Sequence, residues 1–173
     1  MNSLSFEIKA RCSAPARIRK ILCARGASFK GLDRQVDTYF RVPSGRLKLR
    51  QGNIENALIY YKRADQKKIK KCDSLVHPCS KKTPLKRMLT DALGVLAVVD
   101  KKREIFFLRN VKFHIDRVKR LGHFMEIEVF GPAQAAAKLK KQCEFYQRLL
   151  GIRAEDLVAD SYSDQLLRLE TTD

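Results

Sequence analysis

Glu7-Ile8-Lys9-Ala10-Arg11 places a charged residue at every second position and an apolar residue between them. Three later stretches largely repeat this pattern: RLKLR at 46–50, KFHID at 112–116 and EIEVF at 126–130. Because successive side chains of a β-strand point to opposite faces, each stretch predicts a strand with one ionic and one apolar face. If the four strands pair in one sheet, their charges gather on one shared face. Such a face suits a polyanion together with a divalent metal.

The composition predicts a folded protein with phosphate-bearing partners. The chain has 173 residues, 45% of them hydrophobic, with nine Phe and five Tyr, which is enough for one domain over residues 1–173 with a substantial core. Lys plus Arg number 36 against 19 Asp plus Glu, so the formal net charge is +17. An excess of this size is typical of proteins that meet nucleic acid, nucleotides or anionic lipid.

The cysteines and the N-terminus indicate a reduced, cytoplasmic protein outside the membrane. The first residues contain no apolar signal segment, and no apolar run approaches the roughly 18 residues of a membrane span. The five cysteines are odd in number and form no CxxC pair. Cys72, His77 and Cys79 have unsuitable spacing for a metal site, so we interpret their segment as a plain loop.

Turn signals and periodicity predict the order β-α-β-β-β-α-β-β-β-β-α. Most connections between strands are too short for parallel crossovers, so the sheet is expected to be antiparallel. The predicted fold class is α+β, built on a large antiparallel sheet that is curved or closed. After the first strand, further strands are expected at 31–41, 46–50, 57–63, 95–100, 103–109, 111–118 and 123–130. Helices are expected at 15–25, 84–93 and 132–150, and a lysine-rich loop is expected at 66–82.

The ionic face combines cations suited to phosphate with carboxylates suited to a metal. Arginine forks match phosphate oxygens, and lysines add point charges. Carboxylates beside a phosphate cradle are the usual ligands of Mg²⁺. The basic side chains on this face are Lys9, Arg11, Arg46, Lys48, Arg50, Arg63, Lys101, Arg103 and Lys112, and the acidic ones are Glu7, Asp116, Glu126 and Glu128.

Other interpretations of the same residues remain open at this point. A single charged strand is commonly an ordinary solvated face, and Glu126 and Glu128 can act as counter-ions to the lysines. His114 alone is typical of a hydrogen-bonded structural histidine. A nucleic-acid binder would spread its cations over an open surface, with little use for four carboxylates among them. Nucleic acid is therefore not the expected partner, and no Gly-rich phosphate loop is present.

Several motifs, in this order along almost the whole chain, resemble the CYTH family of triphosphate tunnel enzymes. They are FEIKAR at 6–11, QVDTYF at 35–40, GRLKLR at 45–50, DKKR at 100–103, FMEIE at 124–128 and SYSDQLL at 161–167. The family includes class IV adenylyl cyclases, thiamine triphosphatases and inorganic triphosphatases. The resemblance implies an eight-stranded antiparallel barrel whose tunnel is lined by basic and acidic side chains.

The resemblance also implies roles for individual residues. Glu7 corresponds to the second glutamate of the ExExK signature, a metal ligand, and Lys9 corresponds to its lysine, which contacts phosphate and helps to position the nucleophile. Ser5 stands in place of the first glutamate, which removes one carboxylate from the metal site. Asp116, Glu126 and Glu128 are expected to help hold Mg²⁺ or Mn²⁺. The triphosphate is expected to bind Lys9, Arg11, Arg46, Lys48, Arg50, Arg63, Lys101, Arg103 and Lys112.

The expected function is that of a metal-dependent enzyme acting on ATP or another organic or inorganic triphosphate, as a monomer or a homodimer. Similarity of the DKKR segment, of Phe113-His114-Ile115 and of the closing Ser-Tyr segment favours conversion of ATP to cyclic AMP and pyrophosphate. Hydrolysis of a thiamine, inorganic or nucleoside triphosphate fits the same residues. A non-catalytic module that binds polyphosphate or RNA is the alternative from another class.

Overall fold

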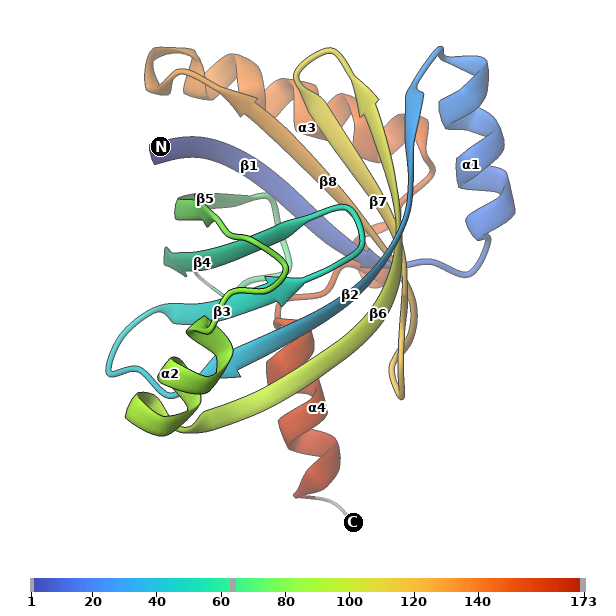
Figure 1. The fold of residues 1–173 in the computed structure, drawn as a ribbon. Helices are drawn as coiled ribbons and strands as arrows, with labels where there is room; N and C mark the ends of the chain where they lie inside the picture. The colour runs from blue at the N-terminus through green and yellow to red at the C-terminus, as the bar shows by residue number, and fades with distance from the viewer. Residues whose placement is uncertain (1, 63–64, 172–173) are drawn as a thin grey trace.

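A computed structural model of the chain describes residues 2–62 and 65–171. Within them, eight strands close into an antiparallel barrel in the order β1-β5-β4-β3-β2-β6-β7-β8 (Figure 1). The strands are β1 (Asn2–Arg11), β2 (Ser28–Phe40), β3 (Arg46–Gln51), β4 (Asn56–Lys62), β5 (Lys70–Pro78), β6 (Val95–Leu108), β7 (Val111–Val118) and β8 (Gly122–Gly131). The helices are α1 (Pro15–Ala24), α2 (Leu85–Leu93), α3 (Ala136–Leu149) and α4 (Tyr162–Glu170), with short 3-10 turns at Ala133–Ala135 and Ala154–Asp156.

Closure of the barrel turns the predicted ionic face inward. Strand β1 pairs with β5 on one side and with β8 on the other, so the sheet has no free edge. In the β1–β8 ladder Glu7 lies opposite Glu128, and Lys9 lies opposite Glu126. Directly opposite residues share a face, so the alternating charges of the two strands line one wall of the interior. This confirms the predicted fold class.

The apolar face of the same strands forms a core on the outside of the barrel, under two helices. Ile8, Phe113 and Ile127 are almost completely buried in one cluster with Leu22 of α1 and Leu139 of α3. Figure 1 shows α1 and α3 lying against the outer surface of the sheet. The alternation of charged and apolar side chains therefore gives each strand an apolar outer face, which the helices cover, and an ionic inner face.

Helix α4 closes part of the interior at one end of the barrel. Tyr162 and Leu166 pack in a second cluster with Phe124 and Val118. The helix begins at a capping box, in which the Ser161 hydroxyl accepts a hydrogen bond from the Asp164 amide at 3.1 Å. The order predicted from the sequence ends with the helix at 132–150, so α4 was not predicted.

The structure corrects two further details of the predicted order. Residues 66–82, expected as a loop, contain strand β5. Its inward side chains are mixed, with the buried Lys70 followed by Cys72, Ser74 and Val76, and its outward ones include the exposed Leu75, so no clear alternation marks the strand. The strands expected at 95–100 and 103–109 form one continuous strand, β6. Lys101 and Lys102 do not interrupt it, because Lys101 is buried in the interior and Lys102 is exposed outside.

The cysteines agree with the prediction of reduced thiols, whereas the segment from Cys72 to Cys79, expected as a plain loop, lies mostly in strand β5. Cys12, Cys23, Cys72, Cys79 and Cys143 are all free thiols. Cys72 is buried and lines the barrel interior, whereas His77 is exposed, so the segment around Cys79 does not assemble a metal site. In the described residues no helix has both the length and the apolar character needed to cross a membrane.

Candidate active site

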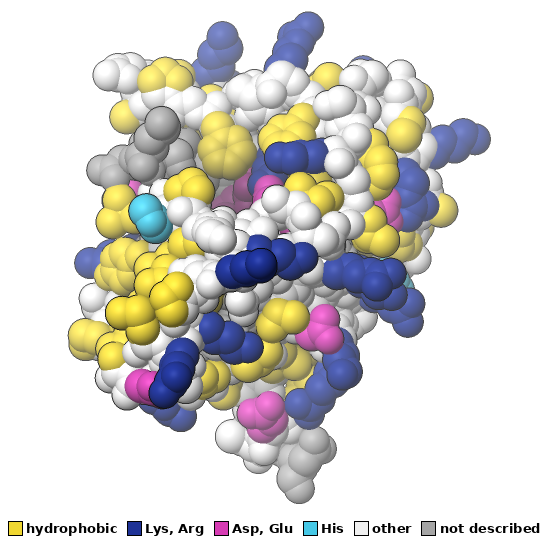
Figure 2. Space-filling view, in the orientation of Figure 1, with side chains coloured by type: hydrophobic (Ala, Val, Ile, Leu, Met, Phe, Trp, Pro, Cys, Tyr) yellow, Lys and Arg dark blue, Asp and Glu magenta, His cyan; other side chains and the backbone are white. Residues whose placement is uncertain are grey.

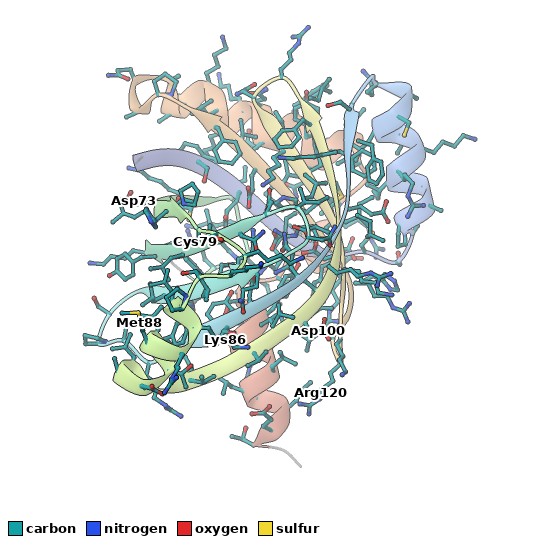
Figure 3. All side chains as sticks on the ribbon, viewed as in Figure 1. Asp73, Cys79, Lys86, Met88, Asp100 and Arg120 are labelled. Atoms are coloured by element: carbon teal, nitrogen blue, oxygen red, sulfur yellow. The ribbon has the colours of Figure 1, made fainter. Side chains whose placement is uncertain are left out.

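The barrel encloses a cavity of about 500 Å³ with a charged wall and a neutral wall. Figure 3 shows side chains from all around the sheet converging on this interior. The charged wall is formed by Glu7, Lys9, Lys48, Arg50, Glu55, Lys101, Arg103, Lys112, Glu126 and Glu128, with Lys30 as a further exposed lining residue. The neutral wall comes from β4 and β5 and consists of Asn56, Ala57, Ile59, Tyr61, Cys72, Ser74, Val76 and Pro78.

Asp37 on β2 holds three of the basic side chains in place. Its carboxylate accepts two hydrogen bonds from Arg50, at 2.9 and 3.1 Å, one from Lys101 at 2.6 Å and one from Lys48 at 3.1 Å. Burial alone would raise the pKa of Asp37, but Arg50, Lys101 and Lys48 hold it well below its usual range. Asp37 therefore stays ionised and orients three cations toward the cavity before any anion binds.

Asp116 plays the same role for Arg103, which differs from the metal-binding role that the family resemblance implied for it. Its two oxygens accept hydrogen bonds from Arg103 at 2.7 and 2.5 Å, and one also accepts the Tyr162 hydroxyl at 2.8 Å. The carboxylate is fully buried, and Arg103 keeps its pKa low despite that burial. Its oxygens face protein donors, so it serves here as a counter-ion that fixes an arginine.

Lys9 is held at the base of the cavity by an acid and an aromatic ring. Its ammonium lies 3.3 Å from a Glu126 oxygen and 3.8 Å from the centroid of the Tyr162 ring. A ring face attracts a cation most strongly where water is excluded, and Lys9 is only 6% exposed. Lys9 is thus a preorganised cation on the cavity wall.

A cluster of metal-ligating groups lies on β7 and β8. His114, Glu126 and Glu128 each offer a ligand atom, and these atoms all lie within 4.8 Å of one another. Glu7 is the cross-strand neighbour of Glu128 and also lines the cavity. Carboxylate oxygens are the donors that Mg²⁺ and Mn²⁺ prefer, so this donor set fits either ion.

Two of these groups have restricted roles. Glu126 already accepts Arg103 at 2.7 Å and pairs with Lys9, which agrees with the counter-ion interpretation of the sequence. His114 is almost fully buried, and its Nε2 has no hydrogen-bond partner among the described residues. Burial together with Arg103 lowers the pKa of His114, which favours the neutral imidazole. Glu7 and Glu128 are therefore the carboxylates best placed for a metal that faces the cavity.

Glu55 joins the site from a turn and was missed by the sequence analysis. Its carboxylate accepts Lys112 at 2.6 Å and Arg50 at 3.1 Å. Asp33 places the turn by accepting the amides of Ile54 and Glu55, both at 2.9 Å. A side chain at Gly52 would come within 2.5 Å of Asp33, so a glycine is needed there. The only sequence signal was this Gly in a short turn.

Two predicted phosphate-binding residues, Arg11 and Arg46, do not line the cavity. Arg11 is exposed, stacks 4.9 Å from the centroid of the Phe124 ring and donates to the carbonyl of Leu121. Arg46 pairs with Asp164 at 2.8 Å, outside the cavity lining. Arg63 lies outside the described residues. The predicted residues Lys9, Lys48, Arg50, Lys101, Arg103 and Lys112 do line the cavity, as do Glu7, Glu126 and Glu128.

Lys101 gives the site a testable pH dependence. Burial and the neighbouring cations Arg50 and Arg103 lower its pKa to about 7. A bound triphosphate favours the charged ammonium, so analogue binding should strengthen as the pH falls from about 8 to about 6, by up to tenfold per unit. The comparison is with Lys101→Arg, whose guanidinium stays charged throughout. Titration of the analogue itself affects both proteins equally, so only a difference between their pH profiles reports on Lys101. If the dissociation constants of the two proteins depend on pH in the same way, the prediction is wrong.

A closed antiparallel barrel with a preorganised ionic interior defines a triphosphate tunnel protein. The CYTH domain profile matches residues 4–162, and the chain belongs to the CYTH family. Members of this family generally act on triphosphates and use a divalent metal. Among curated protein sequences, none matches this chain.

Solved structures share the fold over nearly the whole chain. The PH1012 protein of Pyrococcus horikoshii is 27% identical, with a TM-score of 0.78 over 92% of this chain and 98% of that one. A candidate adenylate cyclase from Vibrio parahaemolyticus is 17% identical, with a TM-score of 0.75 over 96% and 99%. A candidate adenylyl cyclase from Hippeastrum, described as having a dominant triphosphatase activity, is 14% identical, with a TM-score of 0.59 over 96% of each chain.

Proposed function

We propose that this protein, acting as one CYTH domain over residues 1–173, is a metal-dependent enzyme that acts on an organic triphosphate, with ATP as the leading candidate. The observation that carries the proposal is the two-sided cavity. Preorganised cations on one wall match the triphosphate, and the neutral wall of β4 and β5 offers apolar contact to the organic group. An inorganic triphosphate has no use for that second wall.

Each group of residues has a distinct task in this proposal. Lys9, Arg50 and Arg103 bind phosphate oxygens and stabilise the charge that develops on them, and Asp37 and Asp116 hold the arginines in position. Glu7 and Glu128, with Glu126 beside them, would hold Mg²⁺ or Mn²⁺. The metal, when bound, supplies charge neutralisation for the phosphate oxygens. Ser5 lines the same cavity and adds no carboxylate to it.

Two reactions fit this arrangement, and cyclisation of ATP to cyclic AMP and pyrophosphate comes first. The neutral wall supports it, because cyclisation requires the ribose to fold back against the α-phosphate within a pocket. Hydrolysis is the second candidate. It needs only the charged wall and a water molecule, and it is supported by the dominant triphosphatase activity described for the Hippeastrum protein.

The decisive experiment incubates the pure protein with ATP and Mg²⁺ or Mn²⁺ and separates the products. Cyclic AMP with pyrophosphate supports the cyclase, and orthophosphate supports the hydrolase. Turnover of ATP should exceed that of tripolyphosphate. Replacing the paired wall residues in Ile59→Ser/Val76→Ser should raise the KM for ATP about tenfold while leaving tripolyphosphate within twofold. Binding of ATP without any product, unchanged in Glu7→Gln, would refute the proposed enzyme.

A further inference from the structure

The surplus positive charge of this protein lies outside its tunnel. Around the cavity, seven basic side chains nearly balance six acidic ones: Lys9, Lys30, Lys48, Arg50, Lys101, Arg103 and Lys112 against Glu7, Asp37, Glu55, Asp116, Glu126 and Glu128. Removing all of them lowers the net charge by only one, from +17 to +16. The triphosphate site therefore does not account for this charge, which belongs to the remaining surface.

Part of this charge forms a straight row across the outside of the barrel. Arg34 on β2 lies opposite Lys102 on β6, Lys102 lies opposite Arg117 on β7, and Arg117 lies opposite His123 on β8. Lys102 alternates with Lys101 and Arg103, which line the cavity, so this row points outward. We call these four residues the outer basic row, and all four are exposed. Four adjacent strands place the row along about 14 Å.

The cations of the outer basic row lie on neighbouring strands, close enough to repel one another. Like charges directly opposite on neighbouring strands are destabilising. Within the described residues, Arg34, Lys102 and Arg117 have no carboxylate within ion-pair distance. On the same outer face Glu104 is bound by Arg19 at 2.6 Å, and the exposed Asp100 lies two residues before Lys102. Figure 2 shows Lys and Arg side chains gathered along this flank, where Figure 3 labels Asp100 and Arg120.

We propose that the outer basic row binds the phosphate backbone of a nucleic acid, independently of base sequence and of the tunnel. A linear row of cations matches a linear chain of phosphates, and the two arginines can each grip a phosphate with a fork. The sequence argued against nucleic acid as a partner because carboxylates alternate with the cations on the same strands. Closure of the barrel places those carboxylates inside, so that objection does not apply to the outer surface.

An anionic membrane fits these observations less well. Peripheral proteins usually add an apolar helix face that enters the lipid boundary. Here Leu22 of α1, Leu139 of α3 and Leu166 of α4 pack against the barrel, and α2, which has no buried residue, contributes no residue to the outer basic row. The row itself lies on the curved side of a closed barrel rather than on a flat face.

The test uses a labelled 20-nucleotide single-stranded RNA with a 5′-hydroxyl end, which carries no triphosphate for the tunnel. Fluorescence anisotropy should show affinity that falls with salt. The variant Arg34→Gln/Lys102→Gln/Arg117→Gln should bind at least tenfold more weakly, and its log–log salt slope should be smaller by about two. The matched control Lys138→Gln/Lys140→Gln/Lys141→Gln removes the same charge from exposed positions on α3 and should bind within twofold of the native protein.

Two further measurements distinguish RNA binding by the outer basic row from binding in the tunnel and from binding to lipid. Lys9→Ala should bind the RNA normally, and the triple variant of the row should turn over the triphosphate normally with an unchanged melting temperature. If the protein turns over no triphosphate but still binds RNA through the outer basic row, the proposed enzymatic function is refuted and the nucleic-acid proposal stands. Equal losses in the two triple variants, or binding to phosphatidylserine vesicles but not to RNA, would overturn the nucleic-acid proposal.

Discussion

Replacement of Glu128 by glutamine is expected to lower turnover of the triphosphate about 100-fold and to weaken Mn²⁺ binding at least tenfold. Glu128 lies opposite Glu7 on β1 and opposite Lys112 on β7, with its carboxylate on the cavity wall. Glutamine keeps the size of the side chain but removes the charge that a divalent cation needs. Steady-state kinetics measure the turnover, and the electron paramagnetic resonance signal of free Mn²⁺ measures the affinity for the metal.

A matched control tests whether the loss is specific to the cavity. Glu155→Gln makes the same chemical change at an exposed position in the turn Ala154–Asp156 and should alter neither number. Glu7→Gln should behave as Glu128→Gln does, because the two carboxylates face each other across the β1–β8 ladder. Unchanged Mn²⁺ binding in both variants would show that the metal site lies elsewhere.

Replacement of Asp116 by asparagine is expected to lower the free energy of unfolding by about 3 kcal/mol or more. The change leaves the Arg103 guanidinium buried, with its bidentate partner replaced by a neutral amide. Arg103 is only 2% exposed, so water cannot compensate for the lost charge. Urea unfolding followed by circular dichroism measures the difference. Tyr162→Phe, which removes a single hydrogen bond to the same carboxylate, should cost only about 1 kcal/mol.

An exposed ion pair provides the comparison for this effect. Asp156 pairs with Arg153 at the surface, and Asp156→Asn should leave the urea midpoint almost unchanged. The double change Arg103→Met/Asp116→Leu removes both charges and should recover much of the stability while abolishing turnover. If Asp116→Asn unfolds at the same urea concentration as the native protein, the buried pair does not have the role assigned to it.

Local patterns predicted the strands that carry alternating charge, because a period of two is visible over as few as five residues. Strand β5 escaped prediction, because its inward residues Cys72, Ser74 and Val76 lack both charge and a common apolar character. Helix α4 was not predicted, although Ser161 begins it with a capping box, and Glu55 was missed because it lies in a turn. Lys101 and Lys102, considered alone, predict a break between two strands, yet a strand with a polar environment on each side carries charge on both faces.

The sequence by itself determined that this protein has strands with an ionic and an apolar face, a large positive charge and the motifs of the CYTH family. Only the tertiary structure decided which charges meet. The register of the β6–β7 hairpin places Asp116 opposite Arg103, and barrel closure brings Glu55 to Lys112 and separates a nearly balanced interior from a basic exterior. The physical reason is that these partners are set by strand register and by the joining of β1 to β5 and β8. Those pairings involve residues far apart in the chain, which no local pattern specifies.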